Sequence, residues 1–583
     1  MENKTENLIC KNCNQSFTIE VDDFKFYEKL QVPPPMLCRE CRQMRRMSFR
    51  NERTLYKRKC DKSGKDIISI YPPESPFKVY EHTYWYEHFN PMTHGRDFDF
   101  SRPFFEQFRE FMHDMPWPSL RIESCENSDY NNDVGRSKDL YLCSRTHQST
   151  NMLYTYRGNS SRDCVDCMQV FKSSEFLYEC VECESCSKSS FLYFCENCSG
   201  SSMLWNCKNL LDCFMCVNLN NKQYCIQNVQ YSREEYQKIM REVSLSSFEQ
   251  KENILKEFEE FKNKNIRKCL TVINSQNCTG DNMIDSKNCF MSFGIKWCED
   301  SRYLWDNGKY KDCMDCYSGG RDSELLYECT ACSASYNCKF CIRANESSDS
   351  EYSIFFKNCK NLFGCIGLEN KEYCIFNKQY TKEKYEILLP KIIAHMKNTN
   401  EYGEFFPMKL STSAYNETVA EEYFPIKKEE TLQKGLRWRD PDTKSYKVTT
   451  LPKNLPDDIK DSGEEILKET IGCAHEGKCE HGCTTAFRII PREFEFYKRM
   501  NVPLPRLCPN CRHYGRLGKL NPLKLWPGKC QCAGSKSDNG IYQNLAKHHL
   551  HGEDYCPNEF ETSYAPDRPE IIYCEKCYQQ EIY

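Results

Sequence analysis

The sequence predicts a multidomain, mainly β protein in which two tandem cysteine-rich β-solenoid-like repeat arrays, each closed by an α-helix, lie between cysteine ribbons at both ends. Three observations support this fold class. A segment rich in cysteine and proline occurs near both ends of the chain, a long central segment is present twice, and a short unit ending in cysteine recurs inside each central copy. Such internal repetition is typical of folds that stack one small structural unit.

The composition is that of a polar chain with small cores. The chain has 583 residues and a mass of 69.1 kDa, with 28% charged and 39% hydrophobic residues and a mean hydropathy of −0.75. A chain of this length needs several domains. Because aliphatic residues are few, the 41 cysteines and the 13% of aromatic residues have to take their place. We therefore expect cores stabilised by metal, sulfur and aromatic rings.

The repeated terminal segments contain cysteines at metal-ligand spacing. Residues 24–42 and 494–512 are identical at ten of their nineteen positions, and in both copies a further cysteine stands 25 positions before the first cysteine of the segment. Zinc requires four soft or borderline ligands at tetrahedral angles, and two Cys-x2–4-Cys knuckles supply them. We predict two zinc ribbons, with the ligands Cys10, Cys13, Cys38 and Cys41 at the first and Cys479, Cys483, Cys508 and Cys511 at the second.

A third zinc module is expected at the C-terminal end, and two of the three ligand sets contain ambiguities. In the second ribbon the first knuckle has three spacer residues, and Cys473 and His481 lie close to it. The predicted ligands of the third module are Cys530, Cys532, Cys574 and Cys577. Because a one-residue spacing is unusual for a knuckle, a nearby residue can replace one of these ligands: Cys556, His548, His549 or His551.

The first ribbon also carries a family resemblance. Its residue order is C-x2-C, then F-x-F-Y, then V-P-x-P-x2-C-x2-C-R-x2-R. This order resembles the family described as a probable zinc-ribbon domain, and the resemblance covers about forty residues at each end of the chain. It implies a zinc-binding fold and no particular activity. The whole chain resembles large multi-cysteine proteins of uncultivated bacteria and giant viruses.

The central duplication has an offset of 149 residues. Residues 163–167 (DCVDC) return as residues 312–316 (DCMDC), and the sequence LYEC at residues 177–180 returns at residues 326–329. Inside each copy, units such as SSEFLYEC and SSMLWNC recur at intervals that fit one β-strand plus a turn. Stacked units of this kind would form a β-solenoid, in which residues at equivalent positions lie above one another.

Cys-x2-Cys pairs also occur inside the arrays, for example Cys164 with Cys167 and Cys180 with Cys183. In a strand, residues i and i+3 point to opposite faces, so such a pair can chelate a metal only where a turn lies between its members. We favour inward ladders in which cysteine acts as a small hydrophobic residue. Zinc, disulfides and iron–sulfur clusters are the alternatives.

Helix signals and composition divide the chain further. Ser232 and Glu235 form a capping box for a helix after the first array, and a second helix follows Thr381 after the second array. We interpret both helices as caps that cover the last open edge of an array. The expected domains are an N-terminal ribbon with a basic extension (1–60), an aromatic-rich connecting segment with one helix (61–123), array 1 with its helix (124–268), array 2 with its helix (269–398), a packing arm and linker (399–465), the second ribbon (466–527) and the third zinc module (528–583).

A basic stretch follows the first ribbon and suggests an alternative role. Guanidinium groups with interleaved aromatic rings suit phosphates and unstacked bases. A nucleic-acid-binding surface would then use Arg42, Arg45, Arg46, Arg50, Arg53 and Arg58. The other interpretation is a solvated helix, or an arginine network that pairs with the acidic repeats.

The function that these patterns favour is a non-catalytic zinc-binding scaffold or binding protein that presents an extended repeat surface. An enzyme would show an activated nucleophile, a paired acid and base, or a metal with an open position, and none is visible, so an enzyme of unknown chemistry is only an alternative. We expect protein or nucleic acid as partner, no membrane and no small-molecule substrate. The start of the chain lacks the apolar core of a secretion signal, which favours a reducing cytoplasm.

Overall fold

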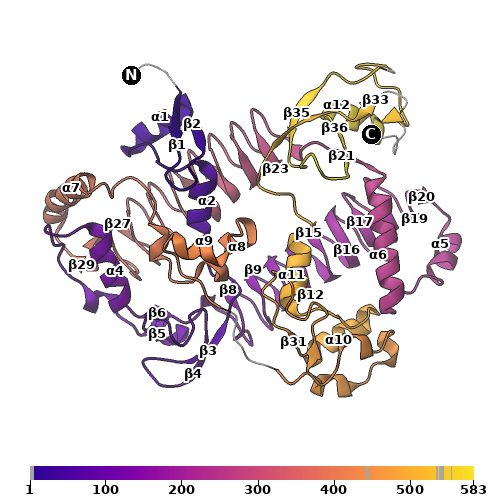
Figure 1. The fold of residues 1–583 in the computed structure, drawn as a ribbon, viewed down its shortest axis with the longest axis horizontal. Coiled ribbons are helices and arrows are strands. Elements are labelled where there is room, and N and C mark those ends of the chain that lie inside the picture. The colour runs from indigo at the N-terminus through magenta and orange to yellow at the C-terminus, as the bar shows by residue number, and fades with distance from the viewer. Residues whose placement is uncertain (1–4, 441–445, 534–535, 538–543, 553) are drawn as a thin grey trace. The chain divides into compact units, whose positions relative to one another are not determined.

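The computed structural model in Figure 1 describes residues 5–440, 446–533, 536–537, 544–552 and 554–583. The fold is mainly β, with a β-solenoid of about 21 turns and cysteine clusters near both ends. The chain forms two compact units. Unit 1 comprises Met1–Leu120 and Leu270–Arg439, and unit 2 comprises Arg121–Cys269 and Asp440–Tyr583. Each unit thus joins one terminal region of the chain to one stretch of coils.

In unit 2 the coils form a 14-stranded sheet whose strands pair almost entirely in parallel. Most equivalent residues of successive coils are 12 positions apart, as in the pairing of Cys183 with Cys195. The strands are β7 (Ile122–Glu123), β8 (Asn132–Gly135), β9 (Ser144–His147), β10 (Thr150–Leu153), β11 (Tyr156–Gly158), β12 (Arg162–Val165), β13 (Met168–Phe171), β14 (Glu175–Tyr178), β15 (Val181–Glu184), β16 (Ser187–Glu196), β17 (Ser202–Trp205), β18 (Phe214–Val217), β19 (Cys225–Ile226) and β20 (Val229–Gln230).

Each coil turns at every third residue, which the sequence pattern did not reveal. In one coil the turning residues are Asn197, Gly200, Met203 and Asn206, all with φ between 52° and 60°. Glycine and asparagine adopt this left-handed conformation at the lowest cost. A coil therefore has four short sides, where one strand and one turn were expected. The first residue after each corner points inward, so the inward positions also recur every third residue; in this coil they are Cys198, Ser201, Leu204 and Cys207.

This geometry explains the Cys-x2-Cys pairs of the arrays. Cys195 and Cys198 lie on adjacent inner walls of one coil, and Cys183, Cys195 and Cys207 follow one another along a single wall, all nearly inaccessible to solvent. The thiols contact backbone carbonyls, as in the 3.4 Å contact from Sγ of Cys198 to the carbonyl oxygen of Glu196. All the cysteines lie in the described part of the chain and are free thiols. The favoured interpretation, inward cysteine ladders, matches this interior.

In unit 1 the coils follow the same plan. Parallel bridges again join residues 12 positions apart, such as Ser348 and Lys360. Aromatic rings line the outside of these coils, where Trp305 stacks on Tyr317 with ring centroids 4.3 Å apart. The strands are β22 (Val272–Ile273), β23 (Gly280–Ile284), β24 (Ser292–Lys296), β25 (Trp305–Lys311), β26 (Tyr317–Glu324), β27 (Lys360–Phe363), β28 (Glu372–Ile375) and β29 (Lys378–Gln379).

Helices follow the coils where the sequence predicted them. Ser232 and Glu235 form the capping box of α5 (Arg233–Met240), and Thr381 caps α7 (Lys382–Asn398). The longer helix α6 (Phe248–Asn263) lies along the coils and contacts β17 and β18, whereas α7 contacts β28. No helix among the described residues is long and apolar enough to cross a membrane.

The segment 61–123 contains two α-helices, where one was expected. They are α3 (His82–Glu87) and α4 (Phe104–Asp114), and a short 3-10 helix, Pro91–His94, lies between them. The buried face of α4 carries Phe104, Phe108 and Phe111. The ring of Phe104 contacts those of Phe363 and Phe376 on the coils of unit 1. Up to Leu120 the segment is therefore part of unit 1, and α4 contributes to its core.

The parts of both units outside the coils are built mainly from hairpins and short helices. In unit 1 they contain β1 (Glu6–Ile9), β2 (Ser16–Ile19), α1 (Val21–Leu30), α2 (Arg39–Met47), β3 (Tyr56–Lys59), β4 (Asp66–Ser69), β5 (Val79–Tyr80), β6 (Trp117–Pro118), α8 (Val419–Tyr423) and α9 (Lys428–Gln433). In unit 2 they contain β21 (Ile266–Lys268), β30 (Ile471–Gly472), β31 (Ala486–Phe487), α10 (Pro491–Met500), α11 (Pro509–Leu517), β32 (Trp526–Lys529), β33 (Cys532–Ala533), β34 (Lys536–Ser537), β35 (Glu559–Thr562), β36 (Ile571–Tyr573) and α12 (Glu575–Ile582).

Candidate metal centres

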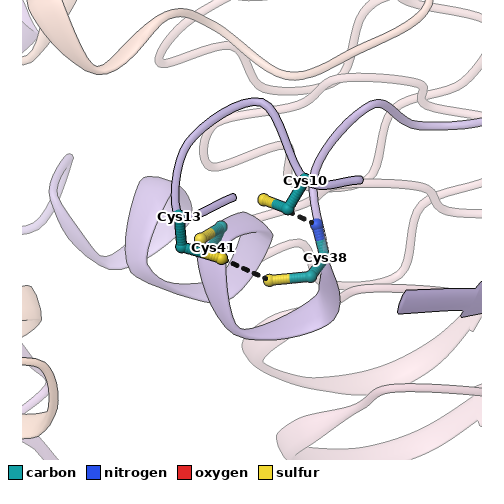
Figure 2. A group of neighbouring side chains, drawn as sticks. All are labelled: Cys10, Cys13, Cys38 and Cys41. Carbon is teal, nitrogen blue, oxygen red and sulfur yellow. Dashed lines mark hydrogen bonds between the residues drawn. The ribbon is translucent and has the colours of Figure 1, made fainter. Parts of the chain in front are cut away.

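Four cysteines converge near the N-terminus, and Figure 2 shows their side chains turned toward one another. Cys10 and Cys13 lie in the turn between β1 and β2, Cys38 precedes α2 as its N-cap residue, and Cys41 lies in the first turn of α2. Their four Sγ atoms all lie within 4.8 Å of one another. The ligand set that the sequence predicts for the first ribbon is therefore brought together in space.

Local geometry explains this convergence. Asn14, with a φ of 59°, closes the hairpin turn that carries Cys10 and Cys13. The prolines before Cys38 keep the chain extended up to α2. The spacing from Cys38 to Cys41 is about one helical turn, so both thiols face the same side.

The spacing of the sulfur atoms suits a tetrahedral ion. A Zn–S bond of about 2.3 Å implies a distance of about 3.8 Å between two ligand sulfurs, and the Sγ atoms of Cys13 and Cys38 are 3.7 Å apart. Burial favours the neutral Cys10 thiol, but N–H groups that include that of Cys38 donate to its sulfur, and the pKa of Cys10 falls to about 7. Backbone donors thus favour the thiolate at Cys10, the form that a metal ion requires, whereas burial raises the pKa of Cys13.

A second group lies in unit 2 and differs from the predicted one by a single ligand. It consists of Cys473, Cys483, Cys508 and Cys511. The Sγ of Cys511 is 3.5 Å from that of Cys508 and 3.8 Å from that of Cys473. The backbone N–H of Cys508 donates to Sγ of Cys473 at 3.3 Å, the same contact that the N–H of Cys38 makes to Cys10. Cys473 therefore takes the place that the sequence assigned to Cys479.

A third group forms close to the C-terminus. It consists of Cys530, Cys556, Cys574 and Cys577, so Cys556 stands where the sequence placed Cys532. The N–H of Cys574 donates to Sγ of Cys530 at 3.3 Å, and Cys574 is the N-cap residue of α12. The contact is thus present in all three groups. In the sequence, the exchange in the second group was signalled only by Cys473, which stands six positions before Cys479. The exchange in the third group was signalled only by Cys556, one of the alternative ligands of that module.

The residues left over from the predicted sets form two further groups. Cys479 lies with His475, His481 and Cys511, and Cys532 lies with His548, His551 and Cys577. His549, which the sequence also offered as a ligand, is in neither group. Among the described residues, the groups that can hold an ion all lie outside the coils.

A fourth knuckle, Cys60 to Ser63, has the backbone arrangement of a ribbon knuckle but contains only one cysteine. Cys60 follows β3 and Ser63 stands three residues later, in the turn that leads to β4. The N–H of Glu81, the N-cap residue of α3, donates to Sγ of Cys60 at 3.3 Å. Glu81 and Tyr84 thus occupy the positions that Cys38 and Cys41 hold in the first ribbon. Cys60 is 470 positions before Cys530, the offset of the repeated terminal segments.

The helix of each terminal ribbon presents arginines to a coil. In unit 1 the Nε of Arg42 donates to the carboxylate of Asp315 at 2.8 Å, and Nη2 of Arg45 donates to that of Glu328 at 2.6 Å. The Nη1 of Arg46 lies 3.2 Å from Asp315. All five side chains are buried, and both carboxylates are fully buried.

Unit 2 repeats this clamp with equivalent residues. Arg512 pairs with Asp166, and Nη1 of Arg516 lies 2.9 Å from Asp166 and 3.3 Å from Glu179. These arginines stand 470 positions after Arg42 and Arg46, and the acids stand 149 positions before Asp315 and Glu328.

The arginines proposed for nucleic-acid binding have carboxylate partners within the fold. For the arginines of the clamp, the partners Asp315 and Glu328 lie on the coils, as in the arginine network on acidic repeats that was the other interpretation of this stretch. Besides the three in the clamp, the pairs are Arg50 with Glu52 at 2.7 Å, Arg53 with Glu422 at 3.2 Å and Arg58 with Asp61 at 2.8 Å.

Comparisons with known proteins do not identify a family. No protein-family model matches the chain, and no curated protein matches it. Among solved structures, one similar chain is that of a "putative acetyltransferase from Desulfovibrio desulfuricans G20", with 12% identity, coverage of 45% of this chain and 68% of that chain, and a TM-score of 0.10. A likeness at that TM-score carries no argument.

Proposed function

We propose that this protein is a non-catalytic zinc-binding scaffold, in which zinc ribbons fasten the terminal regions onto a cysteine-rich solenoid. The observation that carries the proposal is the convergence of four thiols at three places, each with sulfur atoms at the spacing of a tetrahedral zinc ion. Four thiolates saturate zinc, as in structural sites, and leave no open position for a substrate.

Zinc is the ion that these ligands favour. Thiolate sets with tetrahedral geometry select zinc or iron–sulfur clusters, and each four-cysteine group here contains at least one Cys-x2-Cys knuckle. A zinc ribbon supplies about 10 to 16 kcal/mol of apparent folding free energy, which compensates for the small hydrophobic core of such a module.

The solenoid would provide the extended surface of the scaffold. We propose that its two stretches of coils are tandem copies, each closed by the helix that follows it, and that they present this surface to a protein partner. Free thiols throughout the chain agree with a reducing cytoplasm. A nucleic-acid-binding role finds no support in the arginines of the clamp, because carboxylates already neutralise them.

Elemental analysis of the purified full-length protein tests the proposal. We expect zinc at three or more ions per chain, and the double substitution Cys38→Ser and Cys41→Ser should remove one ion. The matched control is Cys207→Ala, because Cys207 is a buried thiol of the coils outside every ligand group. The proposal fails if the folded protein carries no metal, carries iron, or loses zinc when Cys207 is replaced.

A further inference from the structure

The second and third ligand groups each overlap with another group at one cysteine. Cys511 belongs both to the four-cysteine group of the second ribbon and to the group with His475, Cys479 and His481. Cys577 belongs both to the four-cysteine group of the third module and to the group with Cys532, His548 and His551. The first ribbon has no such neighbour among the described residues.

We propose that these two centres are dinuclear, with two metal ions joined by one bridging thiolate, Cys511 in the second ribbon and Cys577 in the third module. The inner ion has four cysteine ligands. The outer ion has one cysteine of its own, two histidines and the bridging cysteine. This inference rests on the proposed zinc-binding function and extends it from three ions to the five ligand groups found among the described residues.

The same donor set occurs twice, in unrelated local sequence. In the second ribbon the outer ligands lie within seven residues, whereas in the third module Cys532 stands 16 positions before His548. The two segments share no spacing, yet both place one thiol and two imidazoles beside the last cysteine of a ribbon. A shared function explains this better than coincidence, because the chain has only 12 histidines.

In the third module the distances fit a tetrahedral ion. Bonds of about 2.0 to 2.3 Å to nitrogen and sulfur imply ligand separations of about 3.3 to 3.8 Å. The Nε2 of His551 lies 3.2 Å from Nδ1 of His548, 3.3 Å from Sγ of Cys577 and 3.7 Å from Sγ of Cys532. Only the contact from Nδ1 of His548 to Cys532, at 2.7 Å, is shorter. These two ligands have to separate by less than 1 Å when both bind one ion.

The surroundings of His548 orient it as a ligand. Its Nε2 lies 2.6 Å from a carboxylate oxygen of Glu581, and both side chains are fully buried. A carboxylate that accepts from one ring nitrogen leaves the other nitrogen directed at the metal, which is the usual arrangement around a metal-bound histidine. Here the remaining nitrogen, Nδ1, is the one that faces Cys532 and His551.

In the second ribbon each of the two histidines has a ring nitrogen that lacks a hydrogen-bond partner among the described residues. The Nδ1 atoms of His475 and His481 are buried and have no hydrogen-bond partner within the described part of the chain. Leaving such atoms unpaired costs free energy, and a metal ion would relieve it. The Sγ of Cys479 lies 3.6 Å from that of Cys511, again the separation of two sulfurs on one zinc ion.

Charge also favours the second ion. A zinc ion with four thiolates carries a net charge of about −2, and an outer zinc that adds one thiolate and two neutral imidazoles brings the centre to about −1. Because the bridging sulfur serves both ions, seven side chains suffice for two tetrahedral sites.

Native mass spectrometry of the zinc-loaded full chain counts the ions. We expect five zinc ions in the wild type, four after the double substitution His475→Ala and His481→Ala, and four after His548→Ala and His551→Ala. His549→Ala is the matched control and should keep five. Three ions in the wild type, or an unchanged count in both double variants, would overturn the dinuclear assignment while leaving the zinc scaffold in place; a wild type without zinc would overturn both.

A second measurement needs no variant and so does not depend on the variants folding. In the wild-type chain loaded with 113Cd, two ions that share a sulfur give mutually coupled NMR signals. We expect two such coupled pairs and one uncoupled signal from the first ribbon, which serves as the internal control. Uncoupled signals throughout would overturn the bridging role of Cys511 and Cys577.

Discussion

Removing one charge from the arginine clamp of unit 1 should loosen the first ribbon from its coil. Asp315 is the residue to change because it faces two buried guanidinium groups, those of Arg42 and Arg46. It has a φ of 59°, which asparagine tolerates well. The substitution Asp315→Asn therefore removes the charge without adding backbone strain.

The size of the effect follows from the charges in the clamp. Arg42, Arg45 and Arg46 face three carboxylates: Asp315, Glu328 and Glu404. With Asp315 neutral, one buried positive charge has no counterpart. Breaking a buried pair in this way costs about 3 to 5 kcal/mol, or roughly a 10²- to 4 × 10³-fold change in an opening equilibrium.

Hydrogen exchange measured by mass spectrometry reads this change locally. Peptides that cover α2 should exchange roughly 10²- to 4 × 10³-fold faster in Asp315→Asn than in the wild type. Peptides that cover α11, in unit 2, should be unaffected and report on the integrity of the rest of the chain.

Asp312→Asn is the matched control. Asp312 also has a positive φ, of 48°, but pairs with Lys29, a side chain that is 50% exposed. Such a pair contributes at most about 1 kcal/mol, so exchange in α2 should change less than tenfold. Equal protection of α2 in the wild type and in Asp315→Asn would refute the idea that the buried charges hold the ribbon in place.

Three further predictions concern acidity, metal removal and the fourth knuckle. Burial raises the pKa of Glu179 to about 7, although Arg516 opposes it; its contribution to stability is thus present below its unfolded pKa of about 4.5 and is lost as the pH rises through 7. The free energy of unfolding of Glu179→Gln, relative to that of the wild type, should therefore rise by about 1 to 3 kcal/mol between pH 5 and pH 8. Urea unfolding of unit 2 measures this difference, and parallel pH profiles of the two proteins would contradict it. A zinc chelator should unfold the ribbons before the coils, which circular dichroism would detect as retained β signal; simultaneous loss would argue against coils that are stable by their own cores. The triple substitution Ser63→Cys, Glu81→Cys and Tyr84→Cys should add one zinc ion beside Cys60, counted by native mass spectrometry, and an unchanged count would show that the knuckle backbone alone does not make a site.

Much of the fold could be predicted from residues that lie close together in the sequence. Helix caps such as Ser232 and Thr381 depend on residues three positions apart, and the first ribbon depends on knuckle spacing, so both can be predicted from neighbouring residues. The repeats predicted stacked coils. Their period was less clear, because the left-handed corners fall on many residue types, Met203 among them, and not only on glycine and asparagine.

What the sequence determined by itself is therefore the chemistry of short segments: pairs of thiols, a repeating coil and the start of helices. Tertiary structure alone decided which thiols meet, because Cys473 displaces Cys479 through a chain path that spacing does not encode. It also decided which groups the arginines of the basic stretch contact. The carboxylates that neutralise Arg42 and Arg45 lie more than 270 positions away, and whether a charge faces solvent or a buried partner depends on contacts between segments remote in sequence.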